Sequence, residues 1–319
     1  MIVGGLLALA LSAQQVPPAP PAPVEEPIRL EDVVVDARRL ESAAEEYVDL
    51  IAAPAGRRGL ARWHDGVCVG VANLENALSQ QLADQVSDVV RSLGLRAHEP
   101  PCHPSVLIIA TTDAARFAEE FVAMRPVLFR VGSPGMDRGK SALRAFMTED
   151  RPVRWWHVSL PIDSQTGMPV IRMPGEVNGA GVGAGSVMDY APITNVNSPS
   201  RLSSQYVDVL KRVFIIVDVD RLNNATAQQL GAYLAMVALA QINPEADTRQ
   251  FDTILNLFDD PAAAPPGLSG WDQAYLEGLY GSGSESHRIN QRSQVQAVAA
   301  AIADAYRDLP DETEPAPVP

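Results

Sequence analysis

Hydrophobic side chains recur along the chain in two spacings, which together predict an α/β (α+β) fold. Four short apolar runs are typical of buried strands: Val67–Val71, Ser105–Ala110, Val153–Leu160 and Val213–Val219. Between the first two, leucine and valine recur at helical spacing over Leu74–Leu93, with Asn73 as a candidate N-cap and Gly94 as a stop. A helix that connects two strands in this way predicts parallel pairing.

Three further helices follow from the same pattern. Asp113 is placed to cap a helix on which Phe117, Phe121 and Met124 share one face. A long apolar helix is predicted within 225–243, and an extra amphipathic C-terminal helix over 289–309.

The two ends of the chain differ from this middle part. The apolar run in residues 1–13 is too short to span a bilayer, which takes about 20 residues, and it is typical of a signal peptide. A buried core segment is the alternative. Residues 14–35 predict a Pro-rich disordered linker, 36–62 an N-terminal helical segment, 63–282 the main domain and 310–319 a disordered tail.

Charge and cysteine content narrow the functional class. The formal net charge of −14 argues against nucleic-acid binding, which needs a basic face. No membrane span is expected once the signal peptide is removed. The signal peptide therefore predicts a periplasmic or secreted protein. In an exported chain, Cys68 and Cys102 predict one disulfide bond. In a cytosolic chain they would be two unpaired buried thiols.

The segment 225–281 contains short sequence motifs in a recognisable order. Thr253–Ile254–Leu255–Asn256 is followed by Leu268–Ser269, Asp272 and then Leu276, Leu279, Tyr280 and Gly281. This order resembles the carboxy-terminal part of the metzincin metalloproteases, with Leu255 at the place of the methionine in their Met turn. Ser269 and Asp272 also read as a helix capping box, which needs no catalytic explanation.

The zinc site that the resemblance implies is missing. Metzincins bind zinc through three histidines beside a general-base glutamate. In this chain Tyr233, Val237 and Asn243 stand at the three histidine positions, and Leu234 stands at the glutamate. Ala240 takes the place of the family's glycine. We therefore expect no metal, no cofactor and no catalytic residue at these degenerate positions. The resemblance implies a metzincin-like mixed twisted sheet with packed helices.

Other motifs predict little chemistry. His98, His103 and Cys102 are close in sequence, but a disulfide cysteine is not a thiolate ligand. His157 follows Trp155 and Trp156 on a predicted strand, where a structural histidine is the default. The Gly-rich segment 175–200 belongs to an excursion of roughly fifty residues, long for a compact domain, and its role is left open.

The sequence therefore predicts a non-catalytic protein of the cell envelope that binds a protein or peptide partner, or acts as a scaffold. One alternative is a hydrolase with a relocated, zinc-free site that uses His157 or the His98/His103 loop. The other is an envelope assembly factor, because LEDVVVDARR around Val33–Val35 resembles the TonB box of TonB-dependent receptors. Such a box would work as an added strand on a partner sheet.

Overall fold

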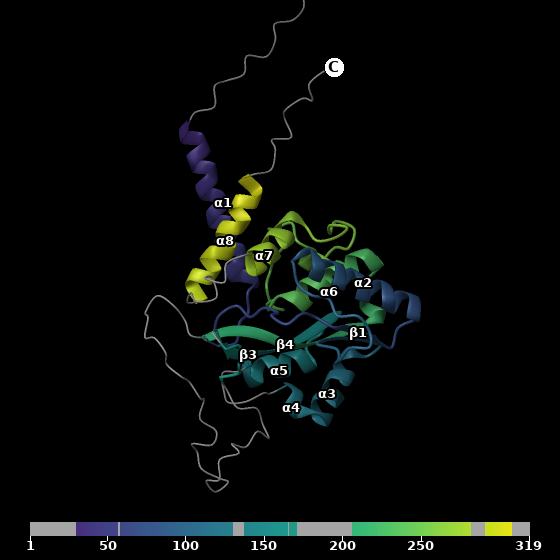
Figure 1. Ribbon diagram of the computed structural model, residues 1–319. Coiled ribbons are helices and arrows are strands. Elements are labelled where there is room, and N and C mark those ends of the chain that lie inside the picture. The colour runs from purple at the N-terminus through teal and green to yellow at the C-terminus, as the bar shows by residue number, and fades with distance from the viewer. Residues whose placement is uncertain are drawn as a thin grey trace, which may run out of the picture.

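A four-stranded mixed sheet separates two layers of helices (Figure 1). The computed structural model describes residues 30–56, 58–129, 137–164, 166–170, 206–281 and 291–307. The strands are β1 (Val69–Ala72), β2 (Val106–Thr111), β3 (Val153–Asp163) and β4 (Tyr206–Asp218), in the order β1-β2-β4-β3. β1, β2 and β4 are parallel, while β3 pairs antiparallel with β4. The predicted α/β class and the parallel pairing of the first two strands are confirmed.

Helix α2 (Asn76–Ser92) connects β1 to β2, but it begins differently from the prediction. Asn73 is not the N-cap, because its φ of 64° places it in a left-handed turn ahead of the helix. Glu75 precedes the first helical residue and makes no capping bond with its side chain. At the other end the predicted stop is correct, since Gly94 has a φ of 74°.

The layer below the sheet contains α3 (Ala114–Met124), α4 (Pro126–Phe129) and α5 (Gly139–Thr148). Asp113 caps α3 as predicted, and its side chain accepts a bond from Arg116 N at 3.0 Å. The predicted apolar face was partly wrong, because Met124 is 71% exposed at the last turn. Phe121 does pack against Phe214 of the sheet, with ring centroids 5.2 Å apart. The buried residues of α3 are Ala114, Ala118 and Val122.

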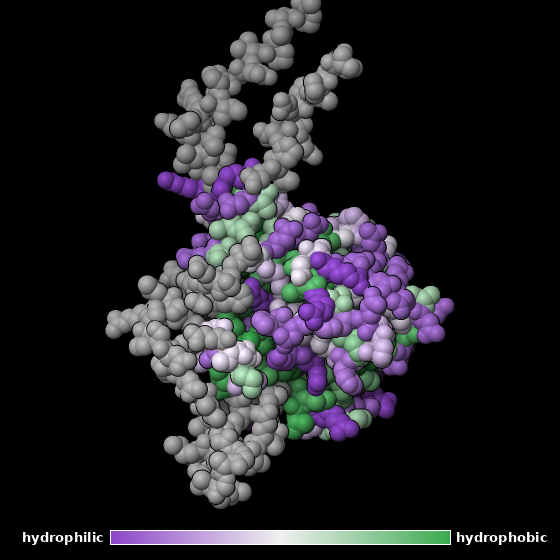
Figure 2. All heavy atoms as spheres, viewed as in Figure 1, coloured by the Kyte–Doolittle hydropathy of each residue, from purple (hydrophilic) through white to green (hydrophobic). Residues whose placement is uncertain are grey.

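Most of the face drawn in Figure 2 is hydrophilic, whereas hydrophobic residues gather below the sheet, where Figure 1 places α3 and α4. Above the sheet lie α6 (Ala227–Leu239) and α7 (Gly270–Tyr280), with α2 packed along α6. α6 is buried on nearly all sides, as its continuous apolar sequence predicts.

The first and last described helices pack against each other although they are far apart in sequence. α1 (Leu30–Ile51) and α8 (Gln291–Arg307) lie side by side over α7 in Figure 1. α8 lies inside the predicted range 289–309. Residues of both helices, among them Tyr47 and Ile302, belong to the core above the sheet. They are therefore part of the main fold.

The predicted boundaries before residue 63 need two corrections. Val33–Val35 and the end of the predicted linker lie within α1, because the helical pattern around Leu40 and Tyr47 continues back to Leu30. The helical segment predicted to residue 62 ends at Ile51. After the helix, single bridges join Ala52 to Ile242 and Arg62 to Val209.

The predicted disulfide is present between Cys68 and Cys102, whose Cα atoms are 6.2 Å apart. It ties the start of β1 to the loop before β2. Among the helices described, none is long and apolar enough to cross a membrane. The predicted signal peptide, the tail and the segment 175–200 lie outside the described residues.

Candidate functional site

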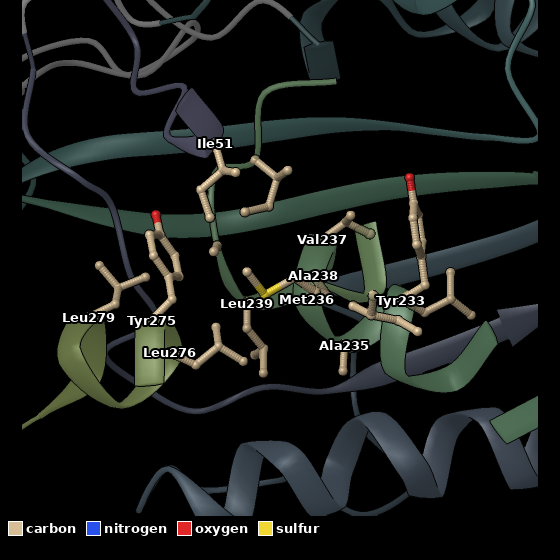
Figure 3. Packing of buried hydrophobic residues seen from close by; sticks show 14 of the residues in the cluster. Ile51, Tyr233, Ala235, Met236, Val237, Ala238, Leu239, Tyr275, Leu276 and Leu279 are labelled. Atoms are coloured by element: carbon tan, nitrogen blue, oxygen red, sulfur yellow. The ribbon is translucent and has the colours of Figure 1, made fainter. Parts of the chain in front are cut away.

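Four of the positions that the metzincin resemblance assigns to its zinc-binding helix lie in the protein core. Tyr233, Leu234, Val237 and Ala240 are at most 6% exposed. Figure 3 shows the side chains of Tyr233 and Val237 on the same side of α6, directed toward the strands. The Tyr233 ring packs edge-on against Trp155 of β3 and Phe258, with centroids 6.1 and 5.0 Å apart. This face of α6 therefore contributes to packing.

The last turn of α6 is closed by donors from other elements. A helix end normally leaves its final carbonyls without partners. Here the bonds run from His157 Nε2 to Val237 O (2.8 Å), from Trp63 Nε1 to Ala238 O (3.0 Å) and from Tyr280 OH to Leu239 O (2.6 Å). Beyond the helix, Trp155 Nε1 donates to Ile242 O at 3.0 Å. These bonds hold the helix end in the core.

His157 serves this packing as a neutral ring. Its Nε2–H donates to the Val237 carbonyl, so the proton is on Nε2. Burial lowers the pKa of His157 to about 4, because the charged imidazolium is poorly solvated there. The structural role expected for this histidine agrees with the geometry.

The turn that corresponds to the Met turn is held by a buried carboxylate. The side chain of Asp272 accepts bonds from Tyr47 OH (3.0 Å), Ile254 N (2.8 Å) and Ser269 N (2.9 Å), and also from Thr253 Oγ1. Burial raises the pKa of Asp272, and the donors around it oppose that rise. The predicted Ser269/Asp272 capping box is present. Leu255 is partly buried against the core.

Asn243, at the place of the third histidine, is the one degenerate position that leads to a surface feature. Its Oδ1 accepts a long bond of 3.4 Å from Arg138, which precedes α5. These two residues approach each other beside a recess at the first half of β3. The recess measures about 340 Å³, counting the space open to solvent.

Three arginines from three places in the chain line this recess. They are Arg138, Arg151 before β3, and Arg154 on β3, and the other lining residues are Ala142, Ala145, Phe146, Trp155, Trp156, Pro244 and Glu245. Arg151 pairs with Glu149. Arg138 forms no ion pair within the described ranges, and burial lowers its pKa while the charge of Glu245 opposes that change.

Arg154 is 3% exposed and only partly satisfied. Its terminal nitrogens donate to the carbonyls of Phe146, Met147 and Glu149 at the end of α5, each at 2.8 Å. Its Nε is buried without a hydrogen-bond partner. An unsatisfied charged group of this kind is costly in a folded protein.

The outer edge of β3 borders the same recess. Asp218 N donates to Pro152 O at 2.8 Å, beside the facing pair Val153 and Val217. Because bonded and non-bonded pairs alternate in an antiparallel ladder, the backbone groups of Val153, Trp155 and His157 point away from β4.

In the part of the chain that the structure describes, no segment pairs with this stretch of β3. The far end is different: Asp163 N donates to Met168 O at 2.9 Å, and Val170 N to Pro161 O at 3.1 Å. Arg58 Nη1 also donates to Ser159 O at 3.4 Å. The open stretch therefore runs from Val153 to Val158.

The other histidines do not form one site with His157. His64 Nδ1 lies 2.8 Å from Asp65 Oδ1, and His98 Nε2 lies 3.2 Å from Asp65 O, near the disulfide. His157 instead bonds to α6. His287 lies outside the described residues. Within the described ranges, no group of three histidine, cysteine or carboxylate side chains is arranged to hold a metal ion.

The arginine recess was not predicted from the sequence. Its residues come from the ends of a helix and a strand and from the segment after α6, so no local spacing joins them. The only sequence signal was that three arginines, at 138, 151 and 154, flank the predicted strand that carries the two tryptophans. Trp155 and Trp156 themselves are buried on opposite faces of β3.

No protein family, no curated protein and no solved structure matches this chain.

Proposed function

We propose that this chain is an exported, non-catalytic binding protein that takes an extended peptide along the outer edge of β3. The observation that carries the proposal is the open stretch from Val153 to Val158, whose outward backbone groups lack partners among the described residues. An extended peptide can supply those partners by joining the sheet as an additional strand.

The non-catalytic part of the proposal rests on the residues at the end of α6. Zinc proteases need imidazole and carboxylate side chains directed into a cleft. In this chain the corresponding side chains are apolar or aromatic and buried, apart from the half-buried amide of Asn243. The helix carbonyls bond to Trp63, His157 and Tyr280.

The order of elements supports descent from a metzincin-like fold. β1, α2 and β2 come first, followed by the antiparallel edge strand β3 and then by β4 and α6. This order is similar to that of the metzincins, in which an edge strand also precedes the site helix. In such a fold the edge strand borders the substrate cleft, so a chain that lost its zinc ligands would keep a surface suited to extended peptides.

Export is supported by the apolar start of the chain and by the disulfide. Disulfides persist in oxidising compartments such as the periplasm. We therefore place the protein in the periplasm or outside the cell as part of the proposal.

The test uses a random library of seven-residue peptides passed over the immobilised full chain. We expect selected peptides to bind. Binding should be lost when the alternate backbone amides that point toward β3 are N-methylated. The same peptides methylated in the opposite phase should bind normally, because those amides point away from the strand.

A parallel zinc assay tests the non-catalytic part. After incubation with zinc and desalting, the protein should hold no stoichiometric metal and should leave the selected peptides uncut. One zinc ion per chain together with peptide hydrolysis would contradict the proposal.

A further inference from the structure

We infer that the arginine recess beside β3 binds a carboxylate, namely the free carboxy terminus of the peptide that pairs with this edge. The inference rests on the proposed function and specifies the ligand at one end of the site. It concerns Arg138, Arg151 and Arg154, which line the recess.

The first argument is local charge. The chain as a whole carries −14, yet this recess has three guanidinium groups and one lining carboxylate, Glu245. Glu245 is exposed, and its charge opposes the lowering of the pKa of Arg138 by burial, as Asp218 and Asp150 do for Arg154. Among the described residues, Arg151 is the one recess arginine with a direct ion-pair partner, Glu149, so the three guanidinium groups leave the recess positive. An anion placed there would reduce the repulsion among the arginines.

The second argument is unsatisfied donor capacity. Arg154 Nε is buried and has no partner, and Arg138 makes only the 3.4 Å bond to Asn243. A guanidinium presents several donors in a planar fork that matches a carboxylate. A carboxylate at Arg138 would replace a long bond to a neutral amide with charge-assisted bonds.

The third argument is the position of the recess on the strand. It is lined by Trp155 and Trp156 near the start of β3, where the backbone groups of Val153 and Trp155 point outward. A peptide whose last residue occupies the recess would run antiparallel to β3 and extend toward Val158. Because the volume of the recess includes space open to solvent, its enclosed part is small, which suits a single carboxylate group better than a whole small molecule.

The test compares each selected peptide as a free acid and as a carboxy-terminal amide, using isothermal titration with the full chain. We expect the acid to bind about tenfold or more tightly than the amide, the range of a charge-assisted hydrogen bond. In Arg138→Gln this preference should disappear. Arg144→Gln is the matched control, because Arg144 is an exposed residue of α5 that does not line the recess.

The other outcomes of this titration contradict either the recess inference or the proposed function. Equal binding of acid and amide by the unmodified protein would overturn the recess inference and leave peptide binding intact. The amide could bind as tightly as the free acid only in peptides that contain Asp or Glu. In that case the recess binds a side-chain carboxylate, and its assignment to the peptide's carboxy terminus is wrong. Binding of neither form would overturn the proposed function and, with it, this inference.

Discussion

Two buried polar side chains organise the region around α6 and α7. Asp272 is fully buried, and its carboxylate collects donors from α1, from the turn before it and from its own helix cap. His157 joins β3 to the end of α6. Both therefore link elements that are distant in sequence, and both have pKa values shifted by burial.

Removing the charge of Asp272 should destabilise the fold. In Asp272→Asn the amide NH2 would face one of the donor groups, leaving buried N–H or O–H groups unsatisfied. We expect the free energy of unfolding to fall by about 2–4 kcal/mol. Urea denaturation measures this, and Glu277→Gln, an exposed change on the same helix, should have little effect. An Asn variant as stable as the original chain would show that the network contributes nothing.

The lowered pKa of His157 predicts a pH dependence of stability. The native ring stays neutral down to about pH 4, whereas in the unfolded chain it binds a proton below about pH 6.5. Its contribution is therefore full above pH 6.5 and is lost as the pH falls toward 4, by about 2–3 kcal/mol.

Urea melts at pH 7 and pH 4 measure this change. The difference between the two should shrink by that amount in His157→Gln, whose amide can still donate to Val237 O. The exposed His64 provides the control, since His64→Gln should keep the original difference. If both variants behave alike, the shift is not in His157.

At the level of elements, α8 is held in place through close contact with α7. A Cβ atom on Gly278 would lie 3.0 Å from Ala301 Cβ and 3.2 Å from the backbone Cα and O of Val298. Gly270, at the start of α7, is similarly close to Tyr306. The glycines of α7 are therefore explained by the approach of α8.

Gly278→Ala should loosen this contact. Alanine favours the helix by about 1 kcal/mol, but the backbone of Val298 cannot move away cheaply, and overpacking costs about 1–3 kcal/mol. We expect a net loss of stability and faster hydrogen exchange in α8. Glu277→Ala, one residue earlier and exposed, should not disturb α8. Unchanged exchange in Gly278→Ala would mean that α8 can shift without cost.

At the scale of the whole molecule, two long-range connections close the fold. One is the packing of α1 on α8, which brings the two ends of the described chain together. The other is the disulfide Cys68–Cys102, which closes a loop with a sequence separation of 34 and sets β1 beside the entry to β2.

Removing the disulfide should lower stability while retaining the fold. In the chain-entropy model a loop of this length contributes about 3–4 kcal/mol. Urea melts of the double variant Cys68→Ser and Cys102→Ser should show a loss of this size, and a reductant should reproduce it in the original chain. A reductant effect in the double variant would point to a cause other than this bond.

The local sequence pattern was sufficient to predict those elements whose residues lie close together in the chain. The strands, the crossover helix α2, the Asp113 and Ser269 caps and the disulfide pair were predicted because each depends on residues close in sequence or on a count of two cysteines. Element starts were less accurate. Asn73 has a capping residue's chemistry but adopts a left-handed turn, and Val33–Val35 follow the surrounding helix despite their strand propensity.

The sequence by itself determined that Tyr233, Val237 and Asn243 stand at the positions that the metzincin resemblance assigns to zinc, since residue identity alone decides which side chains can bind a metal. Only the tertiary structure decided what those residues contact. The caps on the end of α6 come from three distant segments, and the arginine recess forms where the start of α5, the start of β3 and the segment after α6 meet. Such contacts depend on how elements pack, and no spacing along the chain records them.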